Sequence, residues 1–197
     1  MLDAAVQIFA EGGFADTSMS AIAARAEVSK AVLYDCFPGG KQEIYFALLD
    51  RSEVTITEHV LSVLDRTNTL PLEQALRDGI LAFLSYAEEN PLAFRILFSE
   101  AGTSDEEIGK RARRAKEQMV AKMGERTRQI MEAGGLPITN LAPLYNRSIV
   151  AIVTEMARWL HEEQDLRKEQ MVEAVVRWMM KGFEQIIPGD AWRKPVE

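Results

Sequence analysis

Residues 17–41 read TSMSAIAARAEVSKAVLYDCFPGGK, a pattern that predicts two short helices joined by a tight turn. Thr17 or Ser18 can cap the first helix, because its hydroxyl can accept a hydrogen bond from a free backbone N–H two or three residues on. Ser29 can cap the second helix in the same way, and the apolar residues around it have the spacing of a hydrophobic staple. The pattern therefore predicts a helix-turn-helix.

The second of these helices is expected to have two different faces. Leu33 and Phe37 are four residues apart and should point into the core. The opposite face presents Lys30, Ala31 and Tyr34, together with an aspartate, as a polar surface of about the size that meets a DNA major groove. This face is the predicted nucleic-acid contact.

The sequence around this motif resembles the N-terminal part of the TetR family of transcriptional regulators. Residues 2–37 read LDAAVQIFAEGGFADTSMSAIAARAEVSKAVLYDCF. The family pattern has a first helix ending in Phe-Ala-Glu-x-Gly-Phe, followed by a threonine cap, Ile-Ala, Val-Ser and Leu-Tyr-x-x-Phe. The resemblance covers about residues 2–50. It implies a DNA-binding transcriptional regulator, and repression is the commoner role among members of this family.

The resemblance also implies roles for single residues. Thr17, Tyr34 and Lys41 would contact phosphates, and the start of the second helix would approach phosphates and base edges. The predicted DNA-binding residues are Thr17, Ser18, Ser29, Lys30, Ala31, Tyr34 and Lys41. Two features depart from the family pattern. Glu27 stands where the family has glycine, which predicts a left-handed residue at a cost of about 1 kcal/mol, and the link at residues 38–40 is one residue longer than usual.

Composition sets limits on the class of protein. The chain has 197 residues, of which 47% are hydrophobic, so it can bury a core. Its prolines lie at expected helix edges and no run alternates apolar with polar residues, which predicts an all-α fold. The single cysteine, Cys36, excludes an intrachain disulfide and favours a cytoplasmic location; we expect it to be half-buried rather than a redox sensor. We see no signal peptide and no apolar run of membrane-spanning length, so we expect no membrane association.

Charge is the main argument against DNA binding. Residues 1–50 hold three basic and seven acidic residues, a balance of −4, whereas residues 17–41 alone have a balance of +1. DNA-binding modules are usually basic. We therefore expect modest affinity for DNA per subunit, which makes dimerisation more important. The alternative is a helical small-molecule-binding protein that kept the fold but lost specific DNA binding.

We expect about nine helices in two domains. An N-terminal three-helix helix-turn-helix domain would span residues 1–45, and a C-terminal helical bundle for ligand binding and dimerisation would span residues 46–197. The predicted helices cover about residues 2–11, 18–26, 29–37, 41–66, 72–90, 91–101, 104–133, 140–163 and 167–187. The fourth has no internal glycine or proline and, at 1.5 Å per residue, spans roughly 39 Å, which is long enough to link the two domains.

The last two predicted helices are apolar over more than one face. A helix on the outside of a small bundle needs only one apolar stripe. A second apolar surface therefore suggests a partner, most simply the same two helices of another copy in a homodimer. The alternative is a larger monomeric core, and the family resemblance favours the dimer.

The inner faces of the C-terminal helices carry methionines and aromatic residues that could line an apolar ligand cavity. The predicted ligand-binding residues are Phe83, Tyr86, Phe94, Met119, Met123, Tyr145 and Ile152. These residues could equally be plain core. Residues 104–133 also carry a basic face, which is either solvated or a second contact for nucleic acid or an acidic ligand.

The sequence has no pattern for catalysis, metal binding or cofactor binding. Its two histidines, His59 and His161, are far apart, and no HExxH, GxSxG or GxGxxG motif occurs. We therefore expect no enzyme activity, no metal site and no cofactor. The expected partners are a double-stranded DNA operator, a second copy of the chain and a small effector that releases the regulator from DNA by shifting its conformation.

Overall fold

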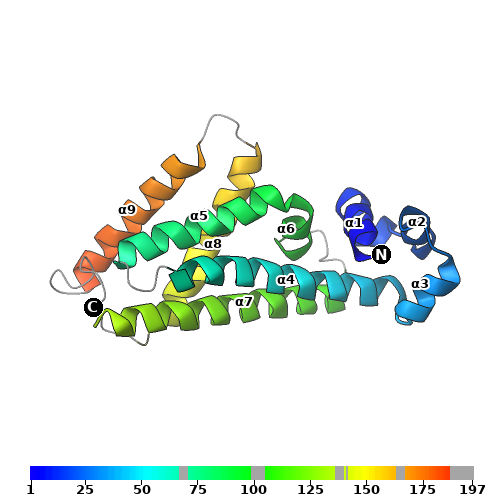
Figure 1. Ribbon diagram of the computed structural model, residues 1–197, viewed down its shortest axis with the longest axis horizontal. Coiled ribbons are helices and arrows are strands. Elements are labelled where there is room, and N and C mark those ends of the chain that lie inside the picture. Colours follow the sequence, from blue (N-terminus) through cyan, green and yellow to red (C-terminus); the bar gives the residue numbers. More distant parts are fainter. Residues whose placement is uncertain (67–70, 99–104, 136–139, 141, 163–166, 187–197) are drawn as a thin grey trace. The chain divides into compact units, whose positions relative to one another are not determined.

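The computed structural model describes residues 1–66, 71–98, 105–135, 140, 142–162 and 167–186. Within these residues every regular element is an α-helix, as predicted (Figure 1). The helices are α1 (Leu2–Asp16), α2 (Met19–Arg25), α3 (Lys30–Cys36), α4 (Gly40–Arg66), α5 (Leu72–Glu89), α6 (Pro91–Phe98), α7 (Glu106–Ala133), α8 (Ala142–Glu162) and α9 (Lys168–Ile186). No helix in this part of the chain is long and apolar enough to span a bilayer.

Most helix boundaries agree with the prediction to within two residues. α4 runs without interruption through 27 residues. Asp105 caps α7, because its Oδ1 accepts hydrogen bonds from the backbone N–H groups two and three positions on, at 3.0 and 3.2 Å. The predicted last turn of the sixth helix, residues 99–101, and everything from residue 187 onward lie outside the described residues.

α1 is longer than predicted and is kinked. We expected the Gly12-Gly13 pair to end the first helix, but α1 runs to Asp16. Gly13 has non-helical angles (φ 73°, ψ 175°), a conformation that a residue without Cβ adopts readily. The glycine therefore bends the helix instead of ending it. The added turn carries Phe14, whose ring stacks on that of Phe9 with 5.9 Å between the centroids.

By its internal contacts the chain divides into two compact units. Unit 1 contains Met1–Thr55 and Asn90–Gln118, and unit 2 contains Ile56–Glu89 and Met119–Glu197. Both α4 and α7 therefore contribute residues to each unit. The units describe packing, and the predicted division of function at residue 45 stays a prediction.

Unit 1 is built around α1, which packs against α2 and α6, while α2 packs against α3. Its fully buried side chains include Ala5, Ile22, Leu33, Ile44, Leu48, Leu49, Leu97 and Ile108. The Tyr45 ring meets Phe9 edge to face at 5.0 Å between the centroids. Burial raises the pKa of the Tyr45 hydroxyl. This core fixes the three short helices of the predicted DNA-binding region.

Side-chain caps and one unusual backbone angle shape the helix-turn-helix. Ser18 accepts a hydrogen bond from the N–H of Ala21 at 3.1 Å, and Ser29 accepts one from Val32 at 3.2 Å. Of the two possible caps for α2, the structure therefore uses Ser18. Glu27, in the turn between the helices, has φ 56° and so adopts the predicted left-handed conformation.

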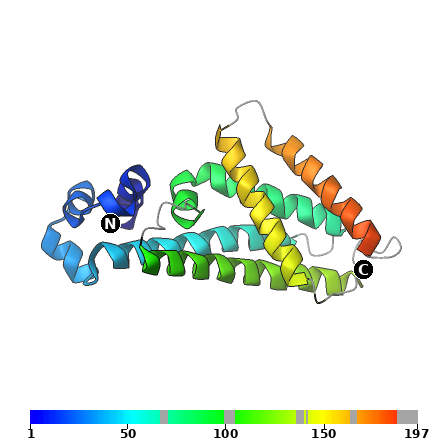
Figure 2. The same cartoon turned by 180° about the vertical axis from the view of Figure 1, so that it is seen from behind.

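In unit 2, α5 packs against α8 and α9 (Figure 2). Arg77 on α5 contacts Glu173 on α9 with 3.0 Å between Nη2 and Oε2. Hydrogen bonding to Arg77 lowers the pKa of the Glu173 carboxyl. At the other end of the same contact, Lys168 on α9 reaches Ser85 at 3.1 Å and forms an ion pair with Glu88. Two polar contacts thus fix α9 along α5.

Candidate nucleic-acid interface and apolar cavity

α3 presents the predicted contact face to solvent. Leu33 is 0% exposed and holds this seven-residue helix against the core. On the outer side Ser29, Lys30 and Ala31 are exposed, and Tyr34 keeps 45% of its surface accessible. These four predicted residues are therefore open to solvent on one short helix. Ser18 is also exposed, at the start of α2.

Two residues near the end of α3 differ from expectation. Cys36 is exposed rather than half-buried, and Phe37 is half-buried rather than fully inside. The reason is the length of α3, which has only two turns and buries only Leu33 completely. Its last turn therefore remains open.

Lys41 and Thr17 have structural roles that the sequence reading missed. The Lys41 Nζ donates to the carbonyl oxygens of Phe14, Ala15 and Thr17 at 2.9, 3.0 and 3.0 Å. It also lies 4.5 Å from the centre of the Phe14 ring. Thr17 is buried, and its hydroxyl donates to the Gly13 carbonyl at 2.7 Å. Both side chains thus satisfy free carbonyls at the end of α1, and their contact with phosphates stays a prediction.

Intramolecular contacts also engage a second cation of the N-terminal region. Arg25 donates to Gln7 at 2.6 Å and lies 3.5 Å from the Glu11 carboxylate. Of the three basic residues among residues 1–50, only Lys30 has no hydrogen-bond or ion-pair partner within the described part of the chain. Lys30 is therefore the cation that α3 offers to a ligand.

The basic face of α7 is largely neutralised by acidic side chains. Arg111 pairs with Asp50, and Arg126 lies 2.8 Å from Asp65. Two further pairs form within α7 itself: Lys110 lies 2.9 Å from Glu106, and Arg128 lies 2.7 Å from Glu125. Hydrogen bonding to Arg128 lowers the pKa of Glu125 to about 2. This pattern favours the solvated, ion-paired interpretation over a second nucleic-acid contact.

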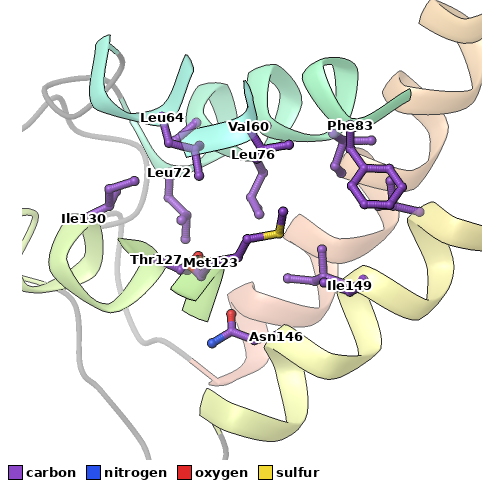
Figure 3. A pocket seen from close by; sticks show the side chains of 15 residues that line it. Val60, Leu64, Leu72, Leu76, Phe83, Met123, Thr127, Ile130, Asn146 and Ile149 are labelled. Carbon is purple, nitrogen blue, oxygen red and sulfur yellow. Dashed lines mark hydrogen bonds between the residues drawn. The ribbon is translucent and has the colours of Figure 1, made fainter. Parts of the chain in front are cut away.

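Unit 2 contains an apolar cavity between α4, α5, α7 and α8 (Figure 3). Its empty volume is about 630 Å³, which includes the open solvent at its mouth. The lining residues are Val60, Leu64, Leu72, Ala75, Leu76, Gly79, Ile80, Phe83, Met123, Thr127, Ile130, Asn146, Ile149, Val150 and Val153. None of these residues is charged. Within the described residues no group of three or more His, Cys, Asp or Glu side chains could hold a metal ion.

The structure brings together only two of the seven predicted ligand-binding residues. Phe83 and Met123 line the cavity. The other five do not: Tyr86 and Met119 are buried core, Phe94 belongs to unit 1 and packs against Phe98, and Tyr145 and Ile152 are half-buried on α8. We predicted that aromatic and methionine side chains would line the cavity. The actual lining consists mainly of aliphatic residues, which the apolar stripes of α4 and α8 could have indicated.

Large apolar side chains remain uncovered on α8 and α9. Leu144 and Trp159 on α8 are 57% and 54% exposed, and Trp178 on α9 is 64% exposed. Exposed tryptophans on two consecutive helices are uncommon on a monomer surface and are frequent at protein interfaces. These residues form the surface that the predicted homodimer would bury.

The chain matches two family models. Residues 1–48 match the model described as bacterial regulatory proteins, tetR family. Residues 69–183 match the model described as tetracyclin repressor-like, C-terminal domain. Together the two matches include the helix-turn-helix and most of unit 2.

Individual proteins with similar sequence or fold are also named as regulators. The HTH-type transcriptional activator FasR of Mycolicibacterium smegmatis is 29% identical over 187 residues, which are 94% of this chain and 82% of that protein. FadR from Bacillus halodurans, a fatty acid degradation regulator, has a TM-score of 0.76 at 18% identity, covering 92% of this chain and 93% of that chain. FadR from Bacillus subtilis in complex with stearoyl-CoA has a TM-score of 0.74 at 18% identity, covering 89% and 94%.

The three carbonyl contacts of Lys41 predict a stability effect for its removal. Lys41→Met keeps the aliphatic stem but leaves the end of α1 without its donor, which should cost about 1.5–3 kcal/mol. Thermal unfolding should show a Tm lower by about 3–12 °C. Lys30→Met is the matched control and should leave the Tm unchanged, because Lys30 is exposed and unpaired. Equal Tm values for the two variants would contradict this role of Lys41.

Proposed function

Because this chain belongs to the TetR family of bacterial transcriptional regulators, we propose that it is a homodimeric DNA-binding regulator whose second unit binds a small, mostly apolar effector. The observation that carries the proposal is the cavity of unit 2, which has apolar walls and no charged side chain. The similar fold of Bacillus subtilis FadR holds stearoyl-CoA. This likeness supports a long acyl chain as the part of the effector that fills the cavity.

The proposed DNA contact is the open face of α3. Lys30 supplies a positive charge, while Ser18, Ser29, Ala31 and Tyr34 supply small or hydrogen-bonding surfaces that can approach the backbone and base edges. Thr17 and Lys41 are also part of the proposed interface. Their main contribution is to hold the end of α1 in place. A cytoplasmic location follows from the proposed role, because the operator lies in the bacterial cytoplasm.

The proposed dimer joins α8 and α9 of two copies through the surface that contains Leu144, Trp159 and Trp178. One cationic residue per recognition helix gives little affinity, so two helices must bind together. Successive major grooves on one side of a duplex are about 34–36 Å apart. The dimer is thus the form in which a weak N-terminal contact becomes a specific one.

The proposed switch acts through α4. This helix begins at Gly40, directly after the helix-turn-helix, and its residues Val60 and Leu64 line the cavity. An effector that fits the cavity better in one position of α4 shifts the population toward that position. If that position sets a distance between the two copies of α3 that does not match successive major grooves, the effector and the operator lower each other's binding affinity by the same factor.

The proposed role on the promoter is repression that the effector relieves. The FasR relative carries the name of an activator, and this observation favours activation as the second candidate. A reporter gene downstream of the bound site distinguishes repression from activation. Deleting the regulator raises expression if the regulator is a repressor and lowers it if the regulator is an activator. A protein that kept the fold but lost its operator would bind no selected fragment from genomic DNA at moderate salt.

The DNA contact predicts opposite effects for two similar charge removals. Lys30→Ala should weaken operator binding at least about tenfold at 0.1 M salt, because each dimer loses two contacts. If Lys30 touches bases, the preferred base at one position should change as well. Arg113→Ala removes an exposed cation of unit 1 on α7 and should leave the affinity unchanged. Operator fragments selected from genomic DNA provide the binding assay. Equal loss in both variants would point to a nonspecific charge effect.

The dimer surface predicts a change of mass. Trp178→Glu and Trp159→Glu place a charge in the proposed interface, where it would be buried without a partner. Light scattering after size exclusion should therefore give the wild-type chain twice the 22.1 kDa monomer mass and each variant the monomer mass. Val54→Glu, at an apolar position on α4 that is 41% exposed, is the control and should stay dimeric. A monomeric wild type would refute the proposed dimer.

The cavity predicts an effect of acyl ligands on operator binding. Stearoyl-CoA should raise the operator Kd of the wild type at least about fivefold. Ile149→Trp fills the cavity from α8 and should abolish this effect while leaving operator affinity without ligand unchanged. Val54→Trp adds the same bulk at an exposed position and should respond like the wild type. Binding of stearoyl-CoA that leaves the operator Kd unaltered would refute the switch.

A further inference from the structure

Two polar side chains interrupt the apolar wall of the cavity, and they differ in whether they form a hydrogen bond within the protein. Thr127 and Asn146 lie among thirteen lining residues that are aliphatic, aromatic, glycine or methionine. The Thr127 hydroxyl donates to the Met123 carbonyl at 3.0 Å, so its one donor is already used within α7. The Asn146 amide has no hydrogen-bond partner within the part of the chain that the structure describes.

The Asn146 amide is available to a ligand, because it is neither fully buried nor paired within the described residues. Asn146 is half-buried on α8, and its carbonyl and amino groups together can make four hydrogen bonds. Figure 3 shows the Asn146 side chain projecting from α8 toward α7, below the side chains of Met123 and Thr127. The amide therefore faces the space between these helices with its hydrogen-bonding groups unused.

The opposite helix leaves room for this amide. Gly124 lies inside α7, where glycine is a poor helix former. A Cβ at residue 124 would lie 2.6 Å from the Asn146 Nδ2 and 3.3 Å from its Cγ. Any larger residue at position 124 would push the amide out of its present place. A helix-weakening glycine and an unpaired amide thus occur together, on facing helices of one cavity.

We propose that Asn146 determines the specificity of the cavity by hydrogen bonding to an uncharged polar group of the effector. This inference rests on the proposed function, and it names the ligand class: an apolar chain that carries an ester, thioester or amide carbonyl. A primary amide can donate to such a carbonyl. A free carboxylate does not fit as well, because no lysine, arginine or histidine among the described residues lines the cavity and a buried carboxylate needs a cation.

The test compares three small probes of similar length: methyl octanoate, octanoate and nonane. Affinities are corrected for the water solubility of each probe and measured by competition with a fluorescent apolar dye. The wild type should prefer methyl octanoate over nonane by at least about tenfold and over octanoate by a similar factor. Asn146→Leu should remove the preference over nonane while keeping nonane binding. Retained nonane binding also shows that the variant is folded.

Two further variants keep the test sharp. Gly124→Ala changes no polar group of the cavity but displaces the amide, so it should also reduce the ester preference. Thr127→Val removes a hydroxyl that is already paired, so the preference should remain. An ester preference of equal size in the wild type and Asn146→Leu overturns the role of Asn146. Octanoate binding as tightly as its methyl ester overturns the uncharged class. A wild type that binds none of the probes refutes the proposed cavity function itself.

Discussion

One ammonium group fixes the geometry on which unit 1 depends. The Lys41 Nζ holds three carbonyl oxygens at the end of α1, and the Phe14 ring lies beneath it. In the turn before α4, the Glu43 carboxylate accepts a hydrogen bond from the Gly39 N–H at 2.7 Å. The start of α4 is therefore tied both to α1 and to the turn that follows α3. A seven-residue helix is not stable alone, so the direction of α3 is set by these ties and by Leu33.

The pairing of cationic side chains within unit 1 bears on how an acidic unit can carry a DNA-binding helix. Arg25 and Lys41 are engaged within the N-terminal region, Arg51 lies 2.8 Å from Asp3, and Arg111 pairs with Asp50. Three of the seven acidic side chains of residues 1–50, namely Asp3, Glu11 and Asp50, are thereby paired, and little positive charge is left over. Attraction to phosphate then falls mainly on α3, which makes binding by a single subunit weak and only slightly dependent on salt, because few counterions are released. Specificity must come from two well-placed helices, and hence from the dimer.

The sequence predicted what is encoded locally and missed what is encoded between distant residues. Caps at Ser18 and Ser29, the left-handed Glu27 and the unbroken α4 each depend on neighbours within a few residues, and the structure confirms them. The kink at Gly13 did not follow, because three carbonyls at the end of α1 are satisfied by Lys41, which lies 24 to 27 residues later in the chain. The cavity lining was mostly missed for the same reason: an apolar stripe shows which face is inside, but not whether the inside is filled.

The composition of α4 bears on whether a cavity in unit 2 can affect α3. After Gly40 the helix contains no glycine and no proline, so it lacks the residues at which helices usually kink. Thr55 donates to the Arg51 carbonyl at 2.7 Å, which engages the backbone on one side without breaking the helix. The proposed switch requires that a displacement at Val60 or Leu64 be transmitted along α4 to its other end. An effector can bias this motion only by its difference in affinity between the two positions, and a tenfold difference is worth about 1.4 kcal/mol. A cavity with apolar walls can supply a difference of that size, because burying about two more methylene groups in one position than in the other is worth roughly this much free energy.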